Sequence, residues 1–547
     1  MTKATEETLS KPAYEIRASE AGVILDGSLT TMEGTDCTEA LQKIIDRYTP
    51  HCSLKLIIDG VALVHNLKLR SNLHIQGLGP HTGFSCNFSD SLFPSAIMNA
   101  NWTTSWGGNT QIIDQNITVS DMTINGNREN GVSGNPDNKR VNKNGGFLVT
   151  ARFYGVRNFQ FKNVRIIDHG GYAVGAANLD WFAFLDCDFI HTEFMNGNLY
   201  PDFGRGHNTD GIHINGPAND GIISNIRIAT ADDGIALNAS DGGRNSTDEG
   251  SVDFYKNVFW MGPIKRVVIN NVTSYNSWQI IRMLSGRDEV FGTGMVASID
   301  DVTISNINGI CANYAVGMEK WPDGGTPEFG KISISHVNVE HRGDGYLHNP
   351  IEWNPDGKPD TPWGNWFFIG IGGNCSQIML SDIKRNSIES TSNAVFVHNG
   401  ATVKDLTISD LSVCETQPCR KDPGPLIKIG GRFIQGYDGK ARVECLTIRN
   451  PRWLREEKTE DPLCEVTADG SVGTMMVTGG IGKGIGSLIE TTGGTIDELV
   501  AVGNSPGNNA PVVRNSGGEI KKATFAATSG IKQHGKVSEI YSDGTGS

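Results

Sequence analysis

The chain has 547 residues, of which 67 are glycine, about 12% against roughly 7% in an average protein. Hydrophobic residues make up 38%, charged residues 20%, and the formal net charge is 47 − 61 = −14. This composition excludes a disordered polyelectrolyte and disfavours a nucleic-acid-binding protein, because nucleic acid is bound through a basic surface. The sequence has no run of about 18 apolar residues, so we expect no transmembrane helix and no membrane partner.

The N-terminal region predicts one helix, over Asp36–Asp46, with Thr35 or Asp36 as its N-cap. Its apolar face consists of Leu41, Ile44 and Ile45. We expect this amphipathic helix to cap the open end of the first coil of a repetitive β-fold.

Short strand-like runs recur along almost the whole chain. Each places a polar residue, often Asn or Asp, among alternating β-branched or aromatic residues, which is typical of half-buried strands. The runs lie at 117–124, 159–166, 267–272, 302–307, 332–337, 378–383 and 403–408. Asn, Asp and Gly beside them are suited to the left-handed backbone of tight corners.

One short strand cannot bury its face, but stacked copies share a continuous core. We therefore predict an all-β fold, a single-stranded right-handed parallel β-helix, and disfavour a β-sandwich, which would need evenly spaced hairpins. The β-helix is expected over residues 21–470, after an extension at 1–20 and before thinner coils at 471–547. Its catalytic coils are expected around residues 205–320.

Ten cysteines are too few for a disulfide scaffold in a chain of this length. Most lie in apolar strand-like runs, as Cys187 does, and are expected to be buried. Cys414 and Cys419 bracket a short loop and could form a disulfide. No CxxC pair occurs, so we expect no structural zinc site.

The densest polar cluster lies between His207 and Asn238. Asp210 precedes one apolar strand, and the pair Asp232 and Asp233 precedes the next. Asp210 and Asp232 are 22 residues apart, about one coil, so their backbones should stack at about 4.8 Å. Three carboxylates in one place should raise at least one pKa, as acid and base catalysis of glycoside hydrolysis requires. The alternatives are corner-forming turn residues and a calcium site.

The segments Gly206–Gly211 and Asp232–Asn238 resemble the signature of the polygalacturonase-type glycoside hydrolases, the pectin-degrading family 28. The segment Ile264–Ser285 resembles the later strand of that family, which ends in an Arg-Ile-Lys motif. The resemblance covers roughly residues 116–340. The segments Gly22–Leu41 and Leu69–Gly77 resemble the start of many β-helix carbohydrate enzymes, including phage tailspikes.

The resemblance implies inverting hydrolysis without a cofactor or a metal. Asp232 or Asp233 would be the general acid, while Asp210 and the remaining Asp activate water. Arg282 would hold the sugar at the cleavage subsite. The residues implied to orient the carboxylates are Asn208 and Asn238.

Three positions depart from the family's pattern. The Gly-His-Gly turn is missing, and the lysine that would contact a uronate carboxylate aligns with Leu284. We therefore favour a sugar other than galacturonate. The second Asp of the family's first motif aligns with His213, which either orients an acid or packs as a wall residue. Further substrate contacts are expected from Glu319, Lys320 and Trp321, because aromatic rings stack on sugars and charged groups read substituents.

The function predicted from the sequence is hydrolysis of a glycosidic bond in a complex polysaccharide or oligosaccharide. The alternatives are a polysaccharide lyase or epimerase on the same fold, and a tailspike-like glycan-binding or depolymerising protein. The expected location is extracellular or periplasmic, although residues 1–16 show no signal peptide. Either a monomer or a homo-oligomer such as a trimer is expected.

Overall fold

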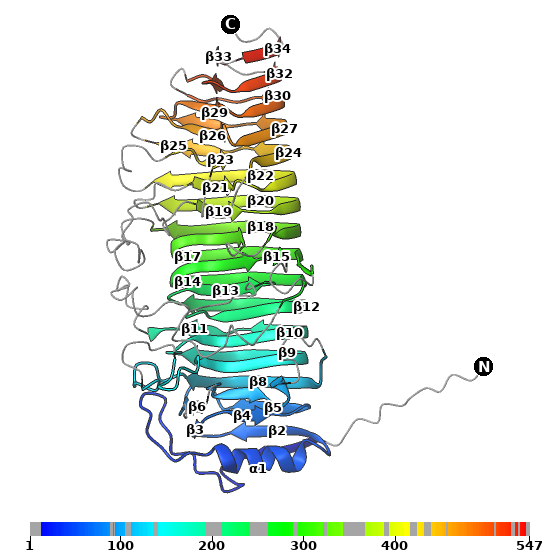
Figure 1. Ribbon diagram of the computed structural model, residues 1–547. Coiled ribbons are helices and arrows are strands. Elements are labelled where there is room, and N and C mark those ends of the chain that lie inside the picture. Colours follow the sequence, from blue (N-terminus) through cyan, green and yellow to red (C-terminus); the bar gives the residue numbers. More distant parts are fainter. Residues whose placement is uncertain are drawn as a thin grey trace, which may run out of the picture.

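In the computed structural model the strands stack one above another into a long solenoid (Figure 1). The residues described are 13–87, 91, 93–103, 111–134, 141–192, 209–240, 261–287, 294–320, 325–342, 367–387, 393–415, 424–431, 439–455, 458–507, 510–526, 531–533 and 536–542.

The described residues form one helix and 34 strands. The N-terminal elements are β1 (Ala13–Arg17), α1 (Thr38–Tyr48), β2 (Ser53–Ile58), β3 (Val61–Val64), β4 (Leu67–Leu69), β5 (Leu73–Gly77), β6 (Gly83–Cys86), β7 (Ile97–Asn99) and β8 (Asp114–Asn125). The central strands are β9 (Val149–Ile167), β10 (Tyr172–Leu185), β11 (Asp188–Ile190), β12 (Ile212–Ala229), β13 (Asp233–Asn238), β14 (Ile264–Leu284), β15 (Gly286–Arg287), β16 (Val296–Ala297), β17 (Ile299–Glu319), β18 (Glu328–His341), β19 (Phe367–Ile371), β20 (Asn374–Ser387) and β21 (Asn393–Val397). The C-terminal strands are β22 (Thr402–Glu415), β23 (Ile427–Ile429), β24 (Ala441–Arg449), β25 (Arg452–Leu454), β26 (Pro462–Thr467), β27 (Gly470–Thr478), β28 (Ile481–Lys483), β29 (Ser487–Thr492), β30 (Thr495–Val502), β31 (Val513–Asn515), β32 (Glu519–Ala526), β33 (Ile531–Gln533) and β34 (Lys536–Ser542).

Neighbouring coils pair in parallel throughout the main sheet, for example β12 with β14, β14 with β17 and β17 with β18. The same side chains therefore stack on themselves: Ile223, Ile269, Ile304 and Ile334 follow one another in register and are all fully buried. Because such ladders join every coil to the next, one apolar core runs along the solenoid. The predicted parallel β-helix is confirmed.

Polar residues form the corners, as predicted. Asn163, Asn225, Asn271 and Asn306 all have φ between 52° and 58°, in the left-handed region. Their amides also link successive coils, since Nδ2 of Asn271 donates to Oδ1 of Asn225 at 2.8 Å. Asn tolerates this backbone conformation, so the sharp turn and the bond between coils come from one residue type.

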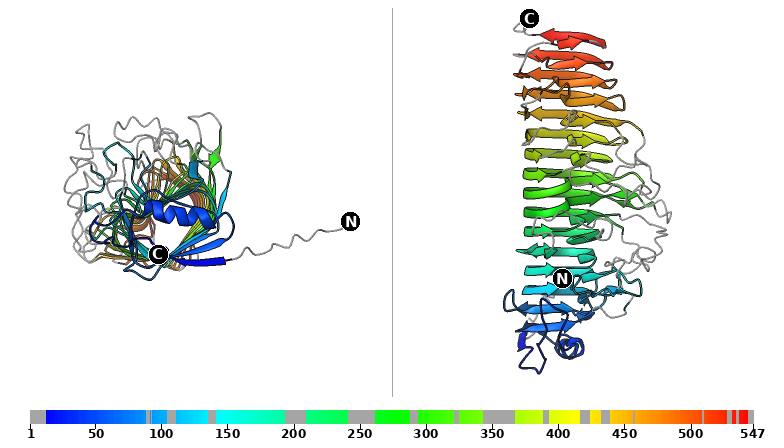
Figure 2. Two further views of the ribbon diagram at one scale, coloured as in Figure 1. Left: turned by 90° about the horizontal axis from the view of Figure 1, so that it is seen from below. Right: turned by 90° about the vertical axis from the view of Figure 1, so that its left-hand side faces the viewer.

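Helix α1 lies at the N-terminal end of the stack (Figures 1 and 2), with Leu41 and Ile45 buried in the common core. It begins two residues later than predicted, and its N-cap is Cys37, without a side-chain capping bond, rather than Thr35 or Asp36. Asp36 nevertheless accepts a hydrogen bond from the backbone N–H of Thr38 at 2.9 Å. That the helix serves to cap the first coil stays a prediction.

At the N-terminal end, strand structure starts earlier than residue 21, the predicted start of the β-helix. Strand β1 pairs in parallel with β2, so strand structure begins inside the expected extension 1–20. Beyond residue 470, β27, β30, β32 and β34 continue the same parallel stack.

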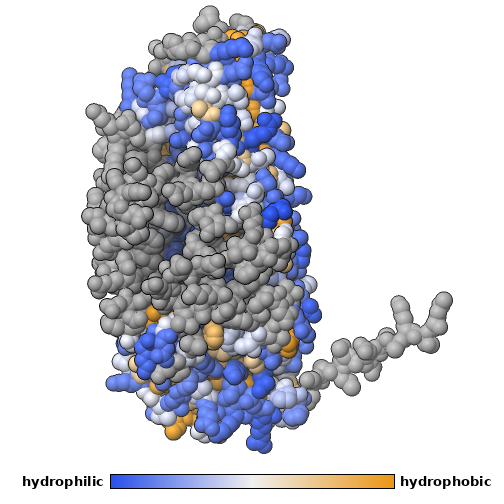
Figure 3. Space-filling model, in the orientation of Figure 1, coloured by the Kyte–Doolittle hydropathy of each residue, from blue (hydrophilic) through white to orange (hydrophobic). Residues whose placement is uncertain are grey.

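The described surface seen in Figure 3 is mostly hydrophilic, with hydrophobic residues in small patches. The one helix of the described residues, α1, is neither long nor apolar enough to cross a membrane. Of nine described cysteines, seven are buried, as expected, and Cys414 and Cys445 are exposed. Cys419 lies outside the described residues, so its pairing with Cys414 stays a prediction.

Candidate active site

The candidate site lies on the outer face of four successive coils, where one strand pattern repeats. The pattern has four consecutive residues, for example Asp233–Ala236. The first and the fourth point away from the apolar core, and the second and third lie at the corner or in the core. Strand pairing places the fourth residues of this pattern next to one another: His213 beside Ala236, Ala236 beside Arg282, and Arg282 beside Gly317. The first residues form a second row that contains Asp210, Asp233, Gln279 and Tyr314.

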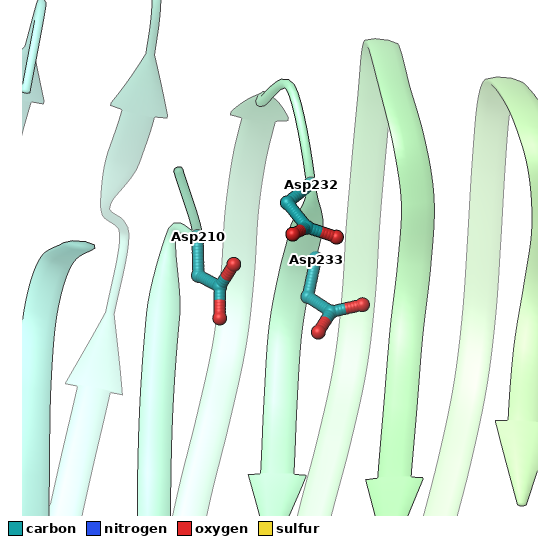
Figure 4. A group of neighbouring side chains, drawn as sticks. All are labelled: Asp210, Asp232 and Asp233. Carbon is teal, nitrogen blue, oxygen red and sulfur yellow. The ribbon is translucent and has the colours of Figure 1, made fainter. Parts of the chain in front are cut away.

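Two of the three predicted aspartates, Asp210 and Asp233, lie in this second row, and Asp232 lies beside them (Figure 4). One carboxylate oxygen from each of Asp210, Asp232 and Asp233 lies within 4.8 Å of the other two. Asp210 is 1% exposed and Asp233 is 2% exposed, whereas Asp232 is half-buried. The residue stacked on Asp210 is Asp233 rather than Asp232, because the coil is one residue longer than expected: Ile212 pairs with Ile235, 23 residues on. Asp232 occupies the corner just before the strand.

His213 binds Asp210 directly. Its Nδ1 lies 2.6 Å from Oδ2 of Asp210, and both side chains are buried. The imidazole also lies flat on the ring of Tyr172, with centroids 4.0 Å apart and planes 10° apart. The imidazole is thus held by packing on Tyr172 and by a hydrogen bond to Asp210, so features of both expectations for His213 are present and its role stays a prediction.

Arg282 lies between two buried carboxyl groups. Its Nη1 is 3.6 Å from Oδ2 of Asp233, and its Nη2 is 3.6 Å from Oε2 of Glu319. A guanidinium stays protonated at any ordinary pH, so it partly compensates both acids in a region with little solvent.

Burial raises the pKa of Asp233 well above its usual range; Arg282 opposes this shift, while the carboxylates of Asp232 and Asp210 add to it. Burial also raises the pKa of Glu319, against the opposing effects of Arg282 and of a hydrogen bond from Tyr314. Two of the acids in this site therefore hold their protons to a higher pH than exposed acids would.

Gln279 and Tyr314 connect these two acids on the other side. With the Gln279 amide oriented to satisfy its neighbours, its nitrogen donates to Oδ1 of Asp233 and, at 2.7 Å, to the Tyr314 hydroxyl. Tyr314 in turn hydrogen-bonds Glu319. The five side chains of Asp233, Gln279, Tyr314, Glu319 and Arg282 thus form a closed ring of polar contacts.

The ring leaves no room beside Arg282 for a larger residue than Gly317. A Cβ atom at Gly317 would lie 2.7 Å from Oε1 of Glu319 and 2.8 Å from the ring of Tyr314. Glycine is therefore required at this position for Tyr314 and Glu319 to approach each other.

Of the remaining predicted residues, the structure describes Asn238 and Lys320. Asn238 is buried one coil from Leu284, and its carbonyl accepts from Nδ2 of Asn215 at 3.5 Å. Lys320 is half-buried, directly after β17. Asn208 and Trp321 lie outside the described residues.

Leu284, which aligns with the family's lysine, is fully buried and pairs in register with Glu319. The position where a lysine would provide a positive charge is thus apolar, and the adjoining coil adds an acid.

Sequence reasoning missed Tyr172, Gln279 and Tyr314 as members of the site. A usable signal exists, because each lies three residues before the outward-facing residues Gly175, Arg282 and Gly317. The same spacing separates Asp210 from His213 and Asp233 from Ala236. Aligning the coils on this spacing would have placed the first member of each pair in one row: Tyr172, Asp210, Asp233, Gln279 and Tyr314.

The aspartate cluster is also the one group of metal-ligating type found among the described residues. Carboxylate oxygens are the ligands preferred by calcium and magnesium. However, the Arg282 guanidinium lies 3.6 Å from one oxygen of Asp233 and would repel a divalent cation bound there. The donor set fits a metal only in part.

No protein-family model matches the chain, and no curated protein matches its sequence. Among solved structures, a tailspike protein of E. coli bacteriophage HK620 in complex with a pentasaccharide is similar over 90% of this chain and 75% of that chain, with a TM-score of 0.50 and 10% identity. A family 28 exopolygalacturonase of Yersinia enterocolitica is similar over 98% and 79%, with a TM-score of 0.44 and 13% identity. The exopolygalacturonase of Thermotoga maritima is similar over 98% and 94%, with a TM-score of 0.33 and 12% identity. At such identities the likeness concerns the β-helix fold.

Proposed function

We propose that the protein is a glycoside hydrolase that cleaves a glycosidic bond in a complex polysaccharide. The observation that carries this proposal is the meeting of Asp210, Asp232 and Asp233 within 4.8 Å, with the pKa of Asp233 raised by burial. Glycoside hydrolysis needs a protonated acid for the leaving oxygen and an ionised carboxylate for water or for direct attack. Because Asp233 is buried and Asp232 is only half-buried, one carboxyl group of this site can be protonated while another is ionised.

Asp233 is assigned as the general acid, because it is the aspartate whose raised pKa favours the protonated form. Asp232, which is the most exposed of the three, and Asp210 are assigned to the attacking water. The resemblance to family 28 supports inversion at the anomeric carbon. Nuclear magnetic resonance of the first product formed will show its anomeric configuration, and retention would overturn this assignment.

His213 is assigned as the positioning residue for Asp210. A buried carboxylate with one oxygen held by Nδ1 cannot rotate freely, so its other oxygen keeps a fixed direction. This interaction replaces the missing Gly-His-Gly turn. Asn238 is assigned to orienting the acids, and Arg282, together with Glu319 and Lys320, to contacting the sugar.

The substrate is proposed to be a glycan without a uronate carboxylate at the cleavage subsite, because Leu284 and Glu319 occupy the region where a cation would be needed. The tailspike neighbour in complex with a pentasaccharide is consistent with a glycan ligand on this fold. A polysaccharide substrate also implies a site of action outside the cytoplasm, either extracellular or periplasmic.

The test is incubation of the protein with plant, algal and bacterial polysaccharides, with reducing-end release and ultraviolet absorbance followed together. New reducing ends without new absorbance are expected, and Asp233→Asn should abolish their release. New absorbance would instead identify an unsaturated product, and therefore a lyase.

A lyase or epimerase is the second candidate, favoured by the three carboxylate oxygens that could hold a divalent cation. Ethylenediaminetetraacetate should abolish such an activity, whereas the proposed hydrolase should retain its activity in the chelator. Glycan binding without turnover by the parent protein would favour a tailspike-like binding protein.

A further inference from the structure

A flat outer face of the solenoid carries two rows of side chains almost without charge. By strand register, the first row runs through eleven successive pairings from Ala183 to Tyr541. The second row lies two residues later in each strand and runs from Leu185 to Ala526. We call these two rows the neutral stripe. Along it, Arg449 is the one charged side chain.

The neutral stripe exposes large apolar side chains. Ile222 is 50% exposed, Val268 43%, Met379 42% and Tyr541 53%. Between them lie small hydroxyl residues such as Thr303, which are half-buried or exposed. Ile222 and Val268 are neighbours in register, whereas Met379 lies between Ser333 and Thr407. The stripe is therefore an uncharged surface of hydroxyl and apolar side chains, with exposed apolar groups at intervals along it.

Charged side chains lie beside the stripe, and several of them form ion pairs there. Arg266 binds both carboxylate oxygens of Asp220, at 2.6 and 2.8 Å, and Arg157 binds Asp180 at 2.8 Å. The chain as a whole has 20% charged residues and a net charge of −14. A stripe of this length with one charged side chain is therefore a local departure from the rest of the sequence.

The dimensions suit a protein contact. Eleven steps of about 4.8 Å make the stripe roughly 50 Å long, and two rows of side chains are about 12 Å wide. The area is on the order of 600 Å² on each partner, close to the lower end of specific interfaces, which bury about 1,200–2,000 Å² in total.

We propose that a second copy of this chain packs on the neutral stripe. Two molecules that each have a net charge of −14 repel one another over most of their surfaces, and repulsion is weakest where neither has charge. Both copies also present rows with the same spacing between coils, so side chains of one can fit between those of the other. A self-complementary patch of this kind is what a two-fold symmetric contact requires.

The experiment is sedimentation velocity of the full chain at micromolar concentrations, for the parent and two double variants. The stripe variant is Thr303→Glu with Met379→Glu, two coils apart in the first row. The control is Thr273→Glu with Asn338→Glu, which adds the same charge at the same spacing in a row beyond the Asn corner. Thermal unfolding of all three checks that each is folded.

The parent and the control should sediment as an assembly larger than the monomer, and the stripe variant as a monomer with an unchanged unfolding midpoint. A monomeric parent would overturn the proposal, as would a stripe variant that stays assembled. A monomeric parent whose polysaccharide binding is lost only in the stripe variant would assign the stripe to glycan instead, which also overturns it.

Discussion

Nδ1 of His213 lies 2.6 Å from Oδ2 of Asp210, and the imidazole is stacked on Tyr172, so the direction of one carboxylate in the aspartate cluster depends on one histidine. In a site that must hold its acids within a few tenths of an ångström of the productive geometry, such a contact affects rate more than binding.

We expect His213→Leu to lower kcat by about 10- to 100-fold with little change in KM, because general acid–base catalysis contributes about 10²–10⁴ and Asp210 would lose its fixed orientation. His213→Asn keeps a donor near the position of Nδ1 and should recover part of the loss. Steady-state kinetics on a substrate found in the polysaccharide panel measures both. Equal kcat for the two variants would show that His213 acts only as a wall residue.

Asp233→Asn should reduce kcat by roughly 10³-fold or more, because the amide cannot donate a proton to the leaving oxygen. The same change should stabilise the protein near neutral pH. Burial raises the pKa of Asp233, so the stability that its protonation contributes is fully present below the unfolded pKa of about 3.9 and is lost as pH rises through the folded pKa.

Asparagine stays neutral throughout this range. The gain in unfolding midpoint of Asp233→Asn over the parent should therefore be largest at neutral pH and shrink toward pH of about 4. Calorimetry at several pH values measures it. A variant that is less stable than the parent at neutral pH would contradict the raised pKa.

Activity should fall on the alkaline side as Asp233 loses its proton, and this limb of the pH profile should depend on Tyr314. Tyr314→Phe keeps the stacking on Phe367, whose ring centroid is 5.0 Å away, but removes the hydroxyl that contacts Gln279 and Glu319. We expect a loss of about 1–2 kcal/mol in unfolding free energy and a displaced alkaline limb of kcat/KM. Phe367→Leu, which alters only the stacking, should leave the limb in place.

Arg282→Gln should destabilise the protein by about 3–5 kcal/mol, because it leaves the buried Asp233 and Glu319 without their common cation. Glu319→Gln in the same chain should restore part of that stability, since one uncompensated acid is then removed. A double-mutant cycle on denaturant unfolding measures the coupling. Additive effects of the two changes would show that the 3.6 Å contacts contribute nothing.

The sequence alone sufficed for the fold, because strand repeats are local signals. Runs such as Val302–Ile307 alternate apolar and polar residues, and asparagines mark the corners, so stacking was the way to bury every strand. It also predicted that Asp210, Asp232 and Asp233 lie close together, since acids before two consecutive strands must lie on neighbouring coils. The helix start shifted by two residues because a cap depends on backbone geometry as well as residue type.

Tertiary structure alone decided how those acids differ. The register of a β-helix changes with one residue of coil length, and here it places Asp233 on Asp210 and leaves Asp232 at the corner. Tyr172, Gln279 and Tyr314 lie far from the aspartates in sequence and reach them only through the strand pairing of several coils. Burial, which raises the pKa of Asp233, is likewise a property of the packed coils, so the acid with the raised pKa could not be chosen from the order of residues.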